Sequence, residues 1–510
     1  MLYSSPFLKL LQQLPGSYQI CTDKQKTLTA KQLIEKSCSL ANYLHSKGIR
    51  RGDHVLLACD TGIEFLVLFV ALVHLRTKTA VADPHMGNER YISKLKQFQP
   101  KWAFIDSRLL LLQENPIIRF FYRRRKSKAF YIPYSKSYTV FATGMWLPLM
   151  QKHFHIRFPE VRDIKFVQDE TDDELILVYT SGTLAEPKAV VHTINSLYAS
   201  LQTIAGLFDK KKSASIITHL PQFALIGMMT GYKTFFWKES TTAKERIKLI
   251  QKNHISTLFG PPSEYRDLMN YCRQKQQVFP SCLTHLILGS APVLTSLLLE
   301  LRQFTNAKFT CLYGMTEHLV VASIDGDEKI NYGGKGDLVG WPLKGMQYKI
   351  EEDNELLIRS PLLFKRYYHS QSTDAFHATG DLVEKDESGR LIMKGRKKNM
   401  IIRANKNIYP GLYETTIAKI KGVREVCMLG IYNEQLHDEQ VILVVDGDNS
   451  LTAKLILEQL KYGPHSIDSD AFPDHIFFQT IPKAGRQQKT DLSLLTVQIK
   501  QRLLSTTILS

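Results

Sequence analysis

The sequence predicts an α/β protein with a large multi-sheet N-terminal part, a β-rich subdomain and a small α+β C-terminal part. Helix-like and strand-like stretches alternate through the N-terminal part, which is typical of βαβ units and a mainly parallel sheet. From about Lys329 the chain changes to short strands separated by glycine turns, and a charged run at 396–398 precedes the last stretch. With 510 residues, the chain is too long for one ordinary core.

The elements of the first 150 residues follow from hydrophobic periodicity. Residues 30–47 have apolar positions at helical spacing and precede Gly48, a residue suited to ending a helix. A buried strand is predicted at 54–58, a helix at 62–75 and a short strand at 80–82. The apolar run at 63–75 is too short to span a bilayer, so it predicts a buried helix.

The later elements complete the N-terminal part and define the domain boundary. Further strands are predicted at 214–218, 257–260, 285–289, 308–312 and, within the β-rich subdomain, 355–359. We place the boundary at the charged run, which gives a domain of residues 1–397 and a second domain of residues 398–510.

The charge balance favours anionic partners. The chain has 66 basic and 49 acidic residues, for a formal net charge of +17. Basic and aromatic residues interleave from Arg119 to Lys126, which fits either contact with an anionic membrane surface or a solvated basic helix whose aromatic side chains face the core. If the membrane hypothesis holds, neutralising Arg123, Arg124 and Arg125 should abolish liposome binding.

Composition also narrows the compartment and the class of partner. The 7 cysteines are scattered without CxxC pairing, which is typical of reduced thiols in a cytosolic protein. The N-terminus lacks a secretory cleavage pattern, so we expect a cytoplasmic location, with peripheral membrane contact as an additional hypothesis. Helix-turn-helix, RRM and zinc-finger patterns are absent from the sequence, so we expect no nucleic-acid partner.

The strongest chemical signal is the segment Leu177-Val-Tyr-Thr-Ser-Gly-Thr-Leu-Ala-Glu-Pro-Lys-Ala-Val-Val191. A buried strand runs into a Thr/Ser/Gly loop with one lysine, Lys188, and then into a second apolar strand. Small residues let backbone N–H groups approach phosphate oxygens, hydroxyls donate hydrogen bonds, and the lysine supplies positive charge. The spacing differs from GxxxxGK[ST], and taken alone such a loop is as often only a turn.

Together with later segments, this loop resembles the YTSGTTGxPKG signature of the acyl-adenylate-forming superfamily, which includes the acyl-CoA synthetases. The later matches follow in the family's order, and they are Leu288-Gly-Ser-Ala-Pro292, Leu312-Tyr-Gly-Met-Thr-Glu317, Thr379-Gly-Asp-Leu382, Gly389-Arg-Leu-Ile-Met-Lys-Gly-Arg396 and Lys489-Thr-Asp491. The resemblance runs from about Leu28 to Leu495. It implies a large N-terminal adenylation domain and a small, mobile C-terminal domain that carries a catalytic lysine.

The resemblance implies that a substrate carboxylate attacks the α-phosphorus of ATP and that pyrophosphate leaves. Such a reaction needs no protein nucleophile, because positioning and charge stabilisation supply the catalysis. Thr316 would contact the α-phosphate, and Glu317 would ligate Mg²⁺, which prefers carboxylate oxygen. The other implied nucleotide-binding residues are Thr180, Ser181, Gly182, Thr183 and Lys188 at the β- and γ-phosphates, Gly289, Ser290, Ala291, Tyr313 and Gly314 at adenine, and Asp381 and Arg396 at the ribose.

The C-terminal match implies that Lys489 reaches the α-phosphate and the substrate carboxylate, where it stabilises developing charge. Arg486 offers a competing alignment, because Gln488 stands where the family has a glycine. Lys398 occupies the hinge about which the C-terminal domain of the family rotates, and CoA is the family's usual acceptor. Two further family glycines correspond to Ala404 and Asn405 here.

Several departures from the family pattern bear on the substrate. Ala224 stands at the histidine of the family's PxxH segment, which would either widen an acyl channel or reflect ordinary helix packing. Among acids, a fatty acid is favoured by Ala224, by the basic and aromatic segment, and by the lack of the acidic pocket residue of amino-acid activators. We therefore expect a fatty acid or another carboxylic acid, ATP, Mg²⁺ and CoA as the reactants and cofactors.

Two alternatives remain open from the sequence. Pro221-Gln-Phe-Ala-Leu225, Leu258-Phe-Gly-Pro-Pro262, Ser290-Ala-Pro292 and Arg486 also resemble the β-lactone synthetases of bacterial olefin biosynthesis, which implies a 3-hydroxy fatty acid whose own hydroxyl attacks the acyl group. The second alternative is a non-catalytic nucleotide-binding protein, since Leu184 and Ala185 replace the second Thr-Gly of the signature. The retained charged residues of the motifs argue against it.

Overall fold

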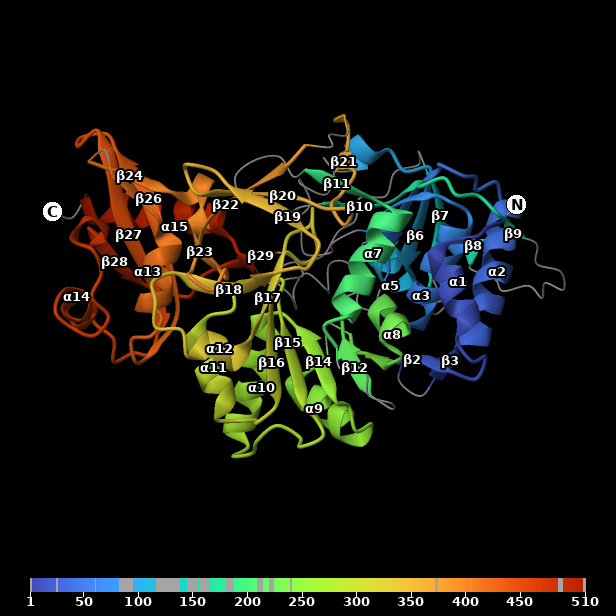
Figure 1. Cartoon of the computed structure of the whole chain (residues 1–510), viewed down its shortest axis with the longest axis horizontal. Coiled ribbons are helices and arrows are strands. Elements are labelled where there is room, and N and C mark those ends of the chain that lie inside the picture. Colours follow the sequence, from blue (N-terminus) through green and yellow to red (C-terminus); the bar gives the residue numbers. More distant parts are fainter. Residues whose placement is uncertain are drawn as a thin grey trace.

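A computed structural model describes residues 2–23, 26–59, 61–81, 95–115, 138–144, 154–155, 166–179, 188–208, 214–219, 224–238, 241–371, 375–404, 406–484 and 489–507. The mixed α/β architecture predicted from the sequence is confirmed, with large sheets in the N-terminal part and a small sheet near the C-terminus. The N-terminal helices and the C-terminal elements lie at opposite ends of an elongated molecule (Figure 1).

The first large sheet contains the strand that leads into the predicted phosphate loop. Its order is β21-β11-β10-β5-β4-β6-β7-β8, parallel from β10 to β8 and antiparallel at β11 and β21. The strands are β21 (Arg366–Tyr367), β11 (Ala189–Thr193), β10 (Glu174–Tyr179), β5 (Lys78–Val81), β4 (His54–Ala58), β6 (Trp102–Asp106), β7 (Thr139–Thr143) and β8 (Phe154–His155). A short parallel pair, β1 (Leu2–Tyr3) with β9 (Phe166–Val167), lies outside this sheet.

The second large sheet joins a parallel half to the antiparallel β-rich region. Its order is β19-β20-β22-β23-β18-β17-β16-β15-β14-β12-β13-β2-β3, and the strands from β16 to β2 are parallel. The strands are β19 (Gln347–Ile350), β20 (Glu355–Arg359), β22 (His377–Lys385), β23 (Leu391–Arg396), β18 (Asp337–Pro342), β17 (Ala322–Asp325), β16 (Lys308–Tyr313), β15 (His285–Leu288), β14 (Thr257–Gly260), β12 (Ser215–Thr218), β13 (Lys233–Phe236), β2 (Gln19–Asp23) and β3 (Lys26–Thr29). Strand β16 pairs in parallel with β15 and antiparallel with β17, so the nucleotide motif that follows β16 lies where the two halves of the sheet meet.

Helices cover both faces of the parallel strands of the second sheet. The helices of the first core are α1 (Pro6–Gln13), α2 (Ala30–Ser46), α3 (Ile63–His74), α7 (Ile194–Ala205) and α8 (Ala224–Thr230). The other face is covered by α9 (Ala243–Lys252), α10 (Pro262–Gln274), α11 (Thr295–Arg302) and α12 (Gly326–Ile330), which lie beside β14 to β16 in Figure 1. A further helix, α5 (Ser107–Glu114), follows β6.

The predicted helices of the first 75 residues form for identifiable reasons. Thr29 and Gln32 make a reciprocal capping box at the start of α2, and Gly48 follows its end with a φ of +102°. Helix α3 is buried along nearly its whole length, from Phe65 to His74. The apolar run predicted to be a buried helix is therefore a core element, and none of the helices in the described ranges is both long and apolar enough to cross a bilayer.

The C-terminal elements build a separate core. The strands β26 (Val423–Asn433), β27 (Asp438–Gly447) and β28 (His475–Phe478) form its sheet, and α13 (Pro410–Ile417) and α14 (Ala453–Lys461) pack on one face. Helix α15 (Leu492–Thr507) packs on the other face. Between the two parts lie the 3₁₀ helix η2 (Lys397–Asn399) and the hairpin of β24 (Ile401–Arg403) with β25 (Lys406–Ile408); the remaining elements are η3 (Ser469–Ala471) and the pair β29 (Lys483–Ala484) with β30 (Lys489–Thr490).

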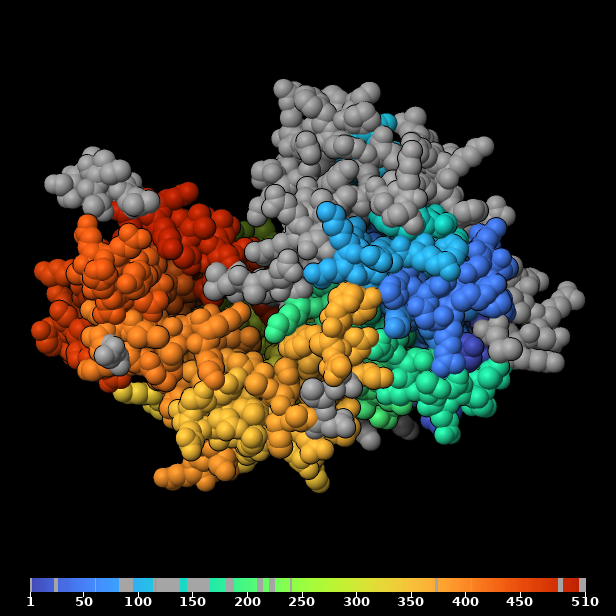
Figure 2. Space-filling model, turned by 90° about the horizontal axis from the view of Figure 1, so that it is seen from above, coloured from blue at the N-terminus to red at the C-terminus, as the bar shows by residue number. Residues whose placement is uncertain are grey.

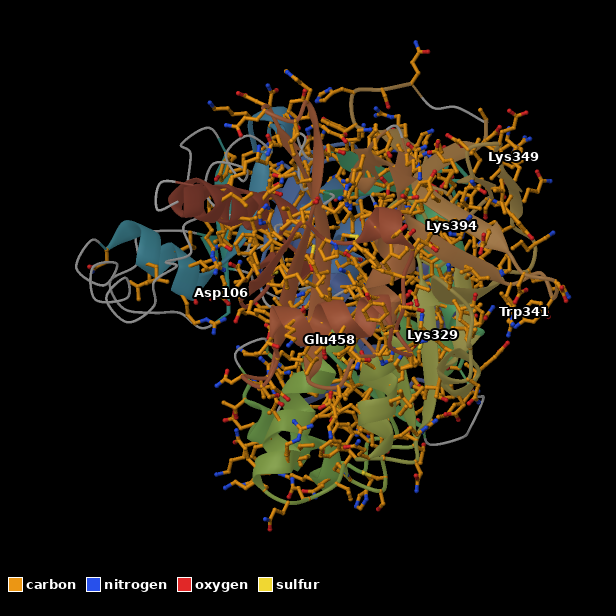
Figure 3. The ribbon with its side chains drawn as sticks, turned by 90° about the vertical axis from the view of Figure 1, so that its left-hand side faces the viewer. Asp106, Lys329, Trp341, Lys349, Lys394 and Glu458 are labelled. Atoms are coloured by element: carbon orange, nitrogen blue, oxygen red, sulfur yellow. The ribbon has the colours of Figure 1, made fainter. Side chains whose placement is uncertain are left out.

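The β-rich region lies between the two ends of the molecule along its long axis (Figure 1). From above, its yellow and orange residues lie between the blue N-terminal residues and the red C-terminal ones (Figure 2). From the C-terminal end, Trp341 and Lys349 lie at the outer edge of this region, and Trp341 is 46% exposed (Figure 3). By contrast Lys329 is buried. Its ammonium group is satisfied there, because Nζ donates to the Leu338 carbonyl and pairs with Asp337 at 2.5 Å.

Candidate active site

The predicted nucleotide motifs meet at the carboxyl edge of the parallel half of the second sheet. The strands β14, β15 and β16 run in parallel and end at Gly260, Leu288 and Tyr313. Ligands of open α/β sheets bind at this edge, because the loops that follow the strands converge there. Gly289 directly follows β15 and Gly314 directly follows β16, so the two motifs lie side by side.

The backbone at these motifs depends on small residues and on unusual dihedral angles. A Cβ on Gly314 would lie 2.1 Å from the carbonyl oxygen of Leu319, so only glycine fits that position. Ser290 has a φ of +69°, in the left-handed region, and Ala291 follows it. The predicted adenine-side residues therefore form tight turns at the strand ends.

Asp381 lies at the centre of a buried polar group. Its Oδ1 lies 2.7 Å from Nε of Arg396, and its Oδ2 accepts a hydrogen bond of 2.6 Å from the Tyr313 hydroxyl. Burial raises the pKa of the Asp381 carboxyl, while the Arg396 guanidinium and the Tyr313 hydroxyl oppose that rise. Burial beside the Asp381 charge also raises the pKa of the Tyr313 phenol well above its usual range. The structure thus brings three predicted residues together, from β16, β22 and β23.

A turn before Asp381 fixes its position. Asp381 and Arg396 are opposite each other in the antiparallel pairing of β22 with β23. The backbone N–H of Asp381 donates to Oγ1 of Thr379 at 3.1 Å, and that of Gly380, with a φ of +71°, donates to a carboxylate oxygen of Glu355 at 3.0 Å. The TGD motif therefore shapes the backbone as well as supplying the carboxylate.

Glu317 and Lys188 share a neighbour that the sequence did not reveal. The hydroxyl of Tyr367, on β21, donates to Oε1 of Glu317 at 2.9 Å, and Nζ of Lys188 lies 4.8 Å from the centre of the Tyr367 ring. The backbone N–H of Phe364 also donates to the Glu317 carbonyl at 2.8 Å. Tyr367 thus links the lysine of the phosphate loop to the predicted metal ligand across two strands that are adjacent only in the folded sheet.

A second residue missed by sequence reasoning supports Thr316. Nε2 of the buried His192, on β11, lies 2.7 Å from the Thr316 carbonyl oxygen. Burial lowers the pKa of His192, so a neutral imidazole whose Nε2 donates this hydrogen bond fits the site. His192 immediately follows the motif residues Leu177–Val191, but its partner is 124 residues away, and periodicity cannot reveal such a contact.

The pair β29–β30 carries Lys489 to the same group of charges. Burial, together with the nearby charge of Arg396, lowers the pKa of Lys489 to about 8, although Glu317 and Asp381 act to raise it. The ladder pairs Lys489 with Ala484. Lys489 is therefore held among the residues predicted to surround the α-phosphate.

The cations of this site suit a polyanionic ligand. Burial lowers the pKa of Lys398, and the charges of Arg396 and Lys188 lower it further. Lys489 and Arg396 likewise disfavour each other's charge. A triphosphate would relieve this repulsion, and Glu317 offers the carboxylate oxygen that Mg²⁺ prefers. The described residues of the site therefore fit Mg-ATP.

The turn after the 3₁₀ helix η2 has adapted to the loss of a family glycine. Ala404 takes a φ of +49°, which costs a residue with a Cβ about 1–2 kcal/mol. Its backbone N–H donates to Oδ2 of Asp438 at 2.8 Å, which offsets part of that cost. A left-handed backbone conformation is thus present at Ala404 without glycine.

Several predicted features lie outside the described residues. They are Thr180, Ser181, Gly182 and Thr183 of the phosphate loop, Arg486, Asn405, the basic segment 119–126 and the side chain of Ala224. The backbone at Ala224 begins α8, in which Leu225, Ile226 and Met228 are buried.

Comparison with known proteins shows which family the chain matches. Residues 11–368 match the family model described as AMP-binding enzyme. The chain is 24% identical to the putative acyl-CoA ligase YdaB of Bacillus subtilis, over 93% of this chain and 95% of that protein. It is 25% identical to the long-chain-fatty-acid-CoA ligase FadD13 of Mycobacterium tuberculosis, over 86% of each.

Solved structures agree with the fold. The amide bond synthetase McbA from Marinactinospora thermotolerans superposes with a TM-score of 0.78 at 17% identity, covering 96% of this chain and 98% of that one. The O-succinylbenzoate coenzyme A synthetase of Bacillus subtilis, in complex with ATP and a magnesium ion, gives a TM-score of 0.75 at 18% identity, covering 94% and 97%. With the family model spanning most of the chain and the motifs gathered at one strand edge, the chain belongs to the AMP-binding enzyme family.

Proposed function

We propose that the chain activates a fatty acid with Mg-ATP and then transfers the acyl group to CoA. The observation that carries this proposal is that Lys489, from the C-terminal part, is buried and lies near enough to Arg396, Glu317 and Asp381 of the N-terminal part for their charges to act on it. These residues are distant in the sequence, and the charges of the site that they form suit a nucleoside triphosphate and a carboxylate.

In the first half-reaction, an oxygen of the substrate carboxylate bonds to the α-phosphorus of ATP, and the bond to pyrophosphate breaks. Lys489 and Thr316 would hold the oxygens on which charge develops, and a site pre-organised in this way lowers the barrier. Asp381 would hold the ribose while Arg396 and Tyr313 fix its carboxylate. Bound Mg²⁺, held by Glu317, would neutralise phosphate charge.

In the second half-reaction, the thiol of CoA would attack the acyl carbon, form a thioester and release AMP. The family resemblance includes rotation of the C-terminal domain, with Lys398 at the hinge and the boundary after residue 397. In the structure, η2 (Lys397–Asn399) lies at this junction. Lys397 is itself anchored to the N-terminal part by ion pairs with Asp353 at 2.6 Å and Glu355 at 2.7 Å, which supports a mobile point after it.

Similarity to curated ligases supports the choice of a fatty acid and of CoA. YdaB is named as a putative acyl-CoA ligase and FadD13 as a long-chain-fatty-acid-CoA ligase, and both align over most of this chain. The name of McbA, an amide bond synthetase, shows that this fold also serves other acceptors. A 3-hydroxy fatty acid that closes to a β-lactone is the alternative carried by the sequence, and a cytoplasmic location with peripheral membrane contact is part of the proposal.

The test is pyrophosphate release from Mg-ATP with a panel of carboxylic acids, each with and without CoA. Release that depends on a fatty acid, with formation of acyl-CoA, is the expected result. Release only with 3-hydroxy acids and without CoA consumption would replace it with the β-lactone alternative, and no release with any acid would overturn it. Lys489→Ala should slow release far more than Arg486→Ala, and the reverse ranking would reassign the catalytic position.

A further inference from the structure

A pair of buried ionisable residues lies at the same strand edge but outside the nucleotide site. His219 follows β12, and Glu264 lies in the first turn of α10, directly after β14. Nδ1 of His219 contacts Oε1 of Glu264, and both side chains are only 7% exposed. Burying a carboxylate costs folding free energy unless both of its oxygens are paired, so a buried pair of this kind suggests a functional role.

One carboxylate oxygen of this pair has no protein partner. Oε2 of Glu264 is buried, and no hydrogen-bond donor within the described ranges reaches it. Gly260 makes room for it, because a Cβ at Gly260 would lie 2.2 Å from that oxygen. A glycine thus lies beside a buried acceptor that has no partner in the described part of the chain, and such an acceptor is suited to a ligand contact.

The polar character continues along α10 and the neighbouring strand. Asp267, one helical turn after Glu264, lies 3.9 Å from Nη1 of Arg246, and the Arg246 guanidinium lies over the ring of Trp237. Nη1 of Arg246 and Nε1 of Trp237 are buried donors without a hydrogen-bond acceptor among the described residues. The face thus offers an unused acceptor and unused donors, with acidic and basic charges nearly balanced.

The position along the edge separates this face from the reacting carboxylate. In the sheet order, β14 is two strands from β16, which carries Tyr313, and β12 is three strands away. With strands roughly 4.8 Å apart, the pair lies roughly 10–14 Å along the edge from Tyr313. A group of the substrate that reaches the pair must be on its tail, away from the carboxyl carbon.

We propose that His219 and Glu264 form a specificity subsite for a hydroxyl group on the tail of the acid that this enzyme activates. A hydroxyl donates one hydrogen bond to Oε2 of Glu264 and can accept another. It is also neutral, which suits a face of balanced charge better than an ammonium group does. This inference rests on the proposed acid activation and narrows its substrate class to hydroxylated acids.

The test compares ATP–pyrophosphate exchange for acids of equal chain length that are unsubstituted, 3-hydroxylated, hydroxylated in mid-chain, terminally hydroxylated or terminally aminated. The wild-type kcat/KM should be at least about tenfold higher for a mid-chain or terminal hydroxy acid than for the unsubstituted acid, because an unmatched buried carboxylate rejects an apolar tail. Glu264→Leu should bring this ratio to about 1, and Glu264→Gln, which keeps an acceptor oxygen, should retain part of it.

Glu300→Gln is the matched control, because Glu300 is a partly exposed residue of α11 that pairs with Arg273 at the surface; it should leave the ratio unchanged. Equal wild-type kcat/KM values for all acids, a preference for the 3-hydroxy or amino acid, or a Glu264→Leu variant that loses activity equally with every acid would overturn the subsite. If none of the acids supports exchange, the result would instead overturn the proposed function.

Discussion

Lys489 links the burial of one side chain to the pH dependence of the proposed reaction. Its pKa falls from the usual value of 10.5 to about 8, because burial and Arg396 disfavour its charge. Only the protonated form can stabilise the developing negative charge. We therefore expect kcat/KM for adenylation to decline by about tenfold per pH unit above roughly pH 8, since this parameter reports the free enzyme. Pyrophosphate release between pH 6.5 and 10 measures it.

The variant Lys489→Arg separates this effect from other alkaline losses. A guanidinium stays protonated throughout this range, so the variant should be slower but should lack the decline near pH 8. The same decline in both proteins would assign the titration to another group.

At the residue scale, the sequence identified the residues expected to contact the nucleotide better than the residues that hold them in position. Tyr313, Asp381 and Arg396 stand in motifs whose residue types already suggest nucleotide chemistry, and the structure places them in contact. His192 and Tyr367 carry no such motif, and each is recognisable only from a partner that is distant in sequence. The same is true of His219 and Glu264, whose significance depends on burial and on an oxygen without a partner.

Among the elements, the short pair β29–β30 is held in place by one ionic group. Nζ of Lys483 pairs with Oε1 of Glu425 on β26 and donates to Oγ1 of Thr490 at 3.2 Å, next to Lys489. The backbone N–H of Asp491 donates to the Pro482 carbonyl at 2.8 Å. Two-residue strands have little stability of their own, so this group orients the lysine.

Glu425→Gln should therefore reduce adenylation about tenfold while changing unfolding free energy by about 1 kcal/mol or less, the usual value of a partly exposed pair. Transfer from preformed acyl-AMP to CoA should stay near the wild-type rate, because Lys489 acts in the first half-reaction. Single-turnover rates of the two half-reactions measure both.

The matched control for this hairpin is Glu434→Gln, in the exposed turn between β26 and β27. It should leave both half-reactions unchanged. Lys483→Met combined with Glu425→Gln should cost no more than either change alone, because the two residues act as a unit. Additive losses, or equal losses in both half-reactions, would contradict the positioning role.

For the whole molecule, the sequence predicted the elements far better than the partners of the strands. The predicted strands at 54–58, 257–260 and 355–359 coincide with β4, β14 and β20, because a buried strand can be predicted from a local run of apolar residues. The parallel pairing of β2 with β13 joins residues more than 200 positions apart, and the antiparallel pairing of β11 with β21 joins residues more than 170 positions apart. Such pairings depend on long-range packing, which hydrophobic periodicity does not encode.

At the junction between the two parts of the chain, α13 lies against β23 and Leu294 packs against the C-terminal core, and exposed polar contacts add to this packing. Nζ of Lys335 lies 3.2 Å from a carboxylate oxygen of Asp468, which also accepts a hydrogen bond from Tyr413. Nη1 of Arg266 donates to the carbonyl of Arg424 at 3.0 Å. Both partners of the Lys335–Asp468 pair are more than half exposed, so the pair contributes at most about 1 kcal/mol and weakens with salt.

Lys335→Glu would place a second negative charge beside Asp468 and disfavour the orientation that delivers Lys489. We expect adenylation to fall by about threefold to fivefold at low ionic strength, since a domain equilibrium shifts by the change in contact energy, and to recover at about 0.5 M salt as screening removes the repulsion. The transfer to CoA should be unchanged or faster, because it uses the other orientation. Lys344→Glu, the same charge change in the exposed turn between β18 and β19, is the control. If both variants lose adenylation equally, or if salt fails to restore it, the loss comes from overall charge or local damage rather than from the junction.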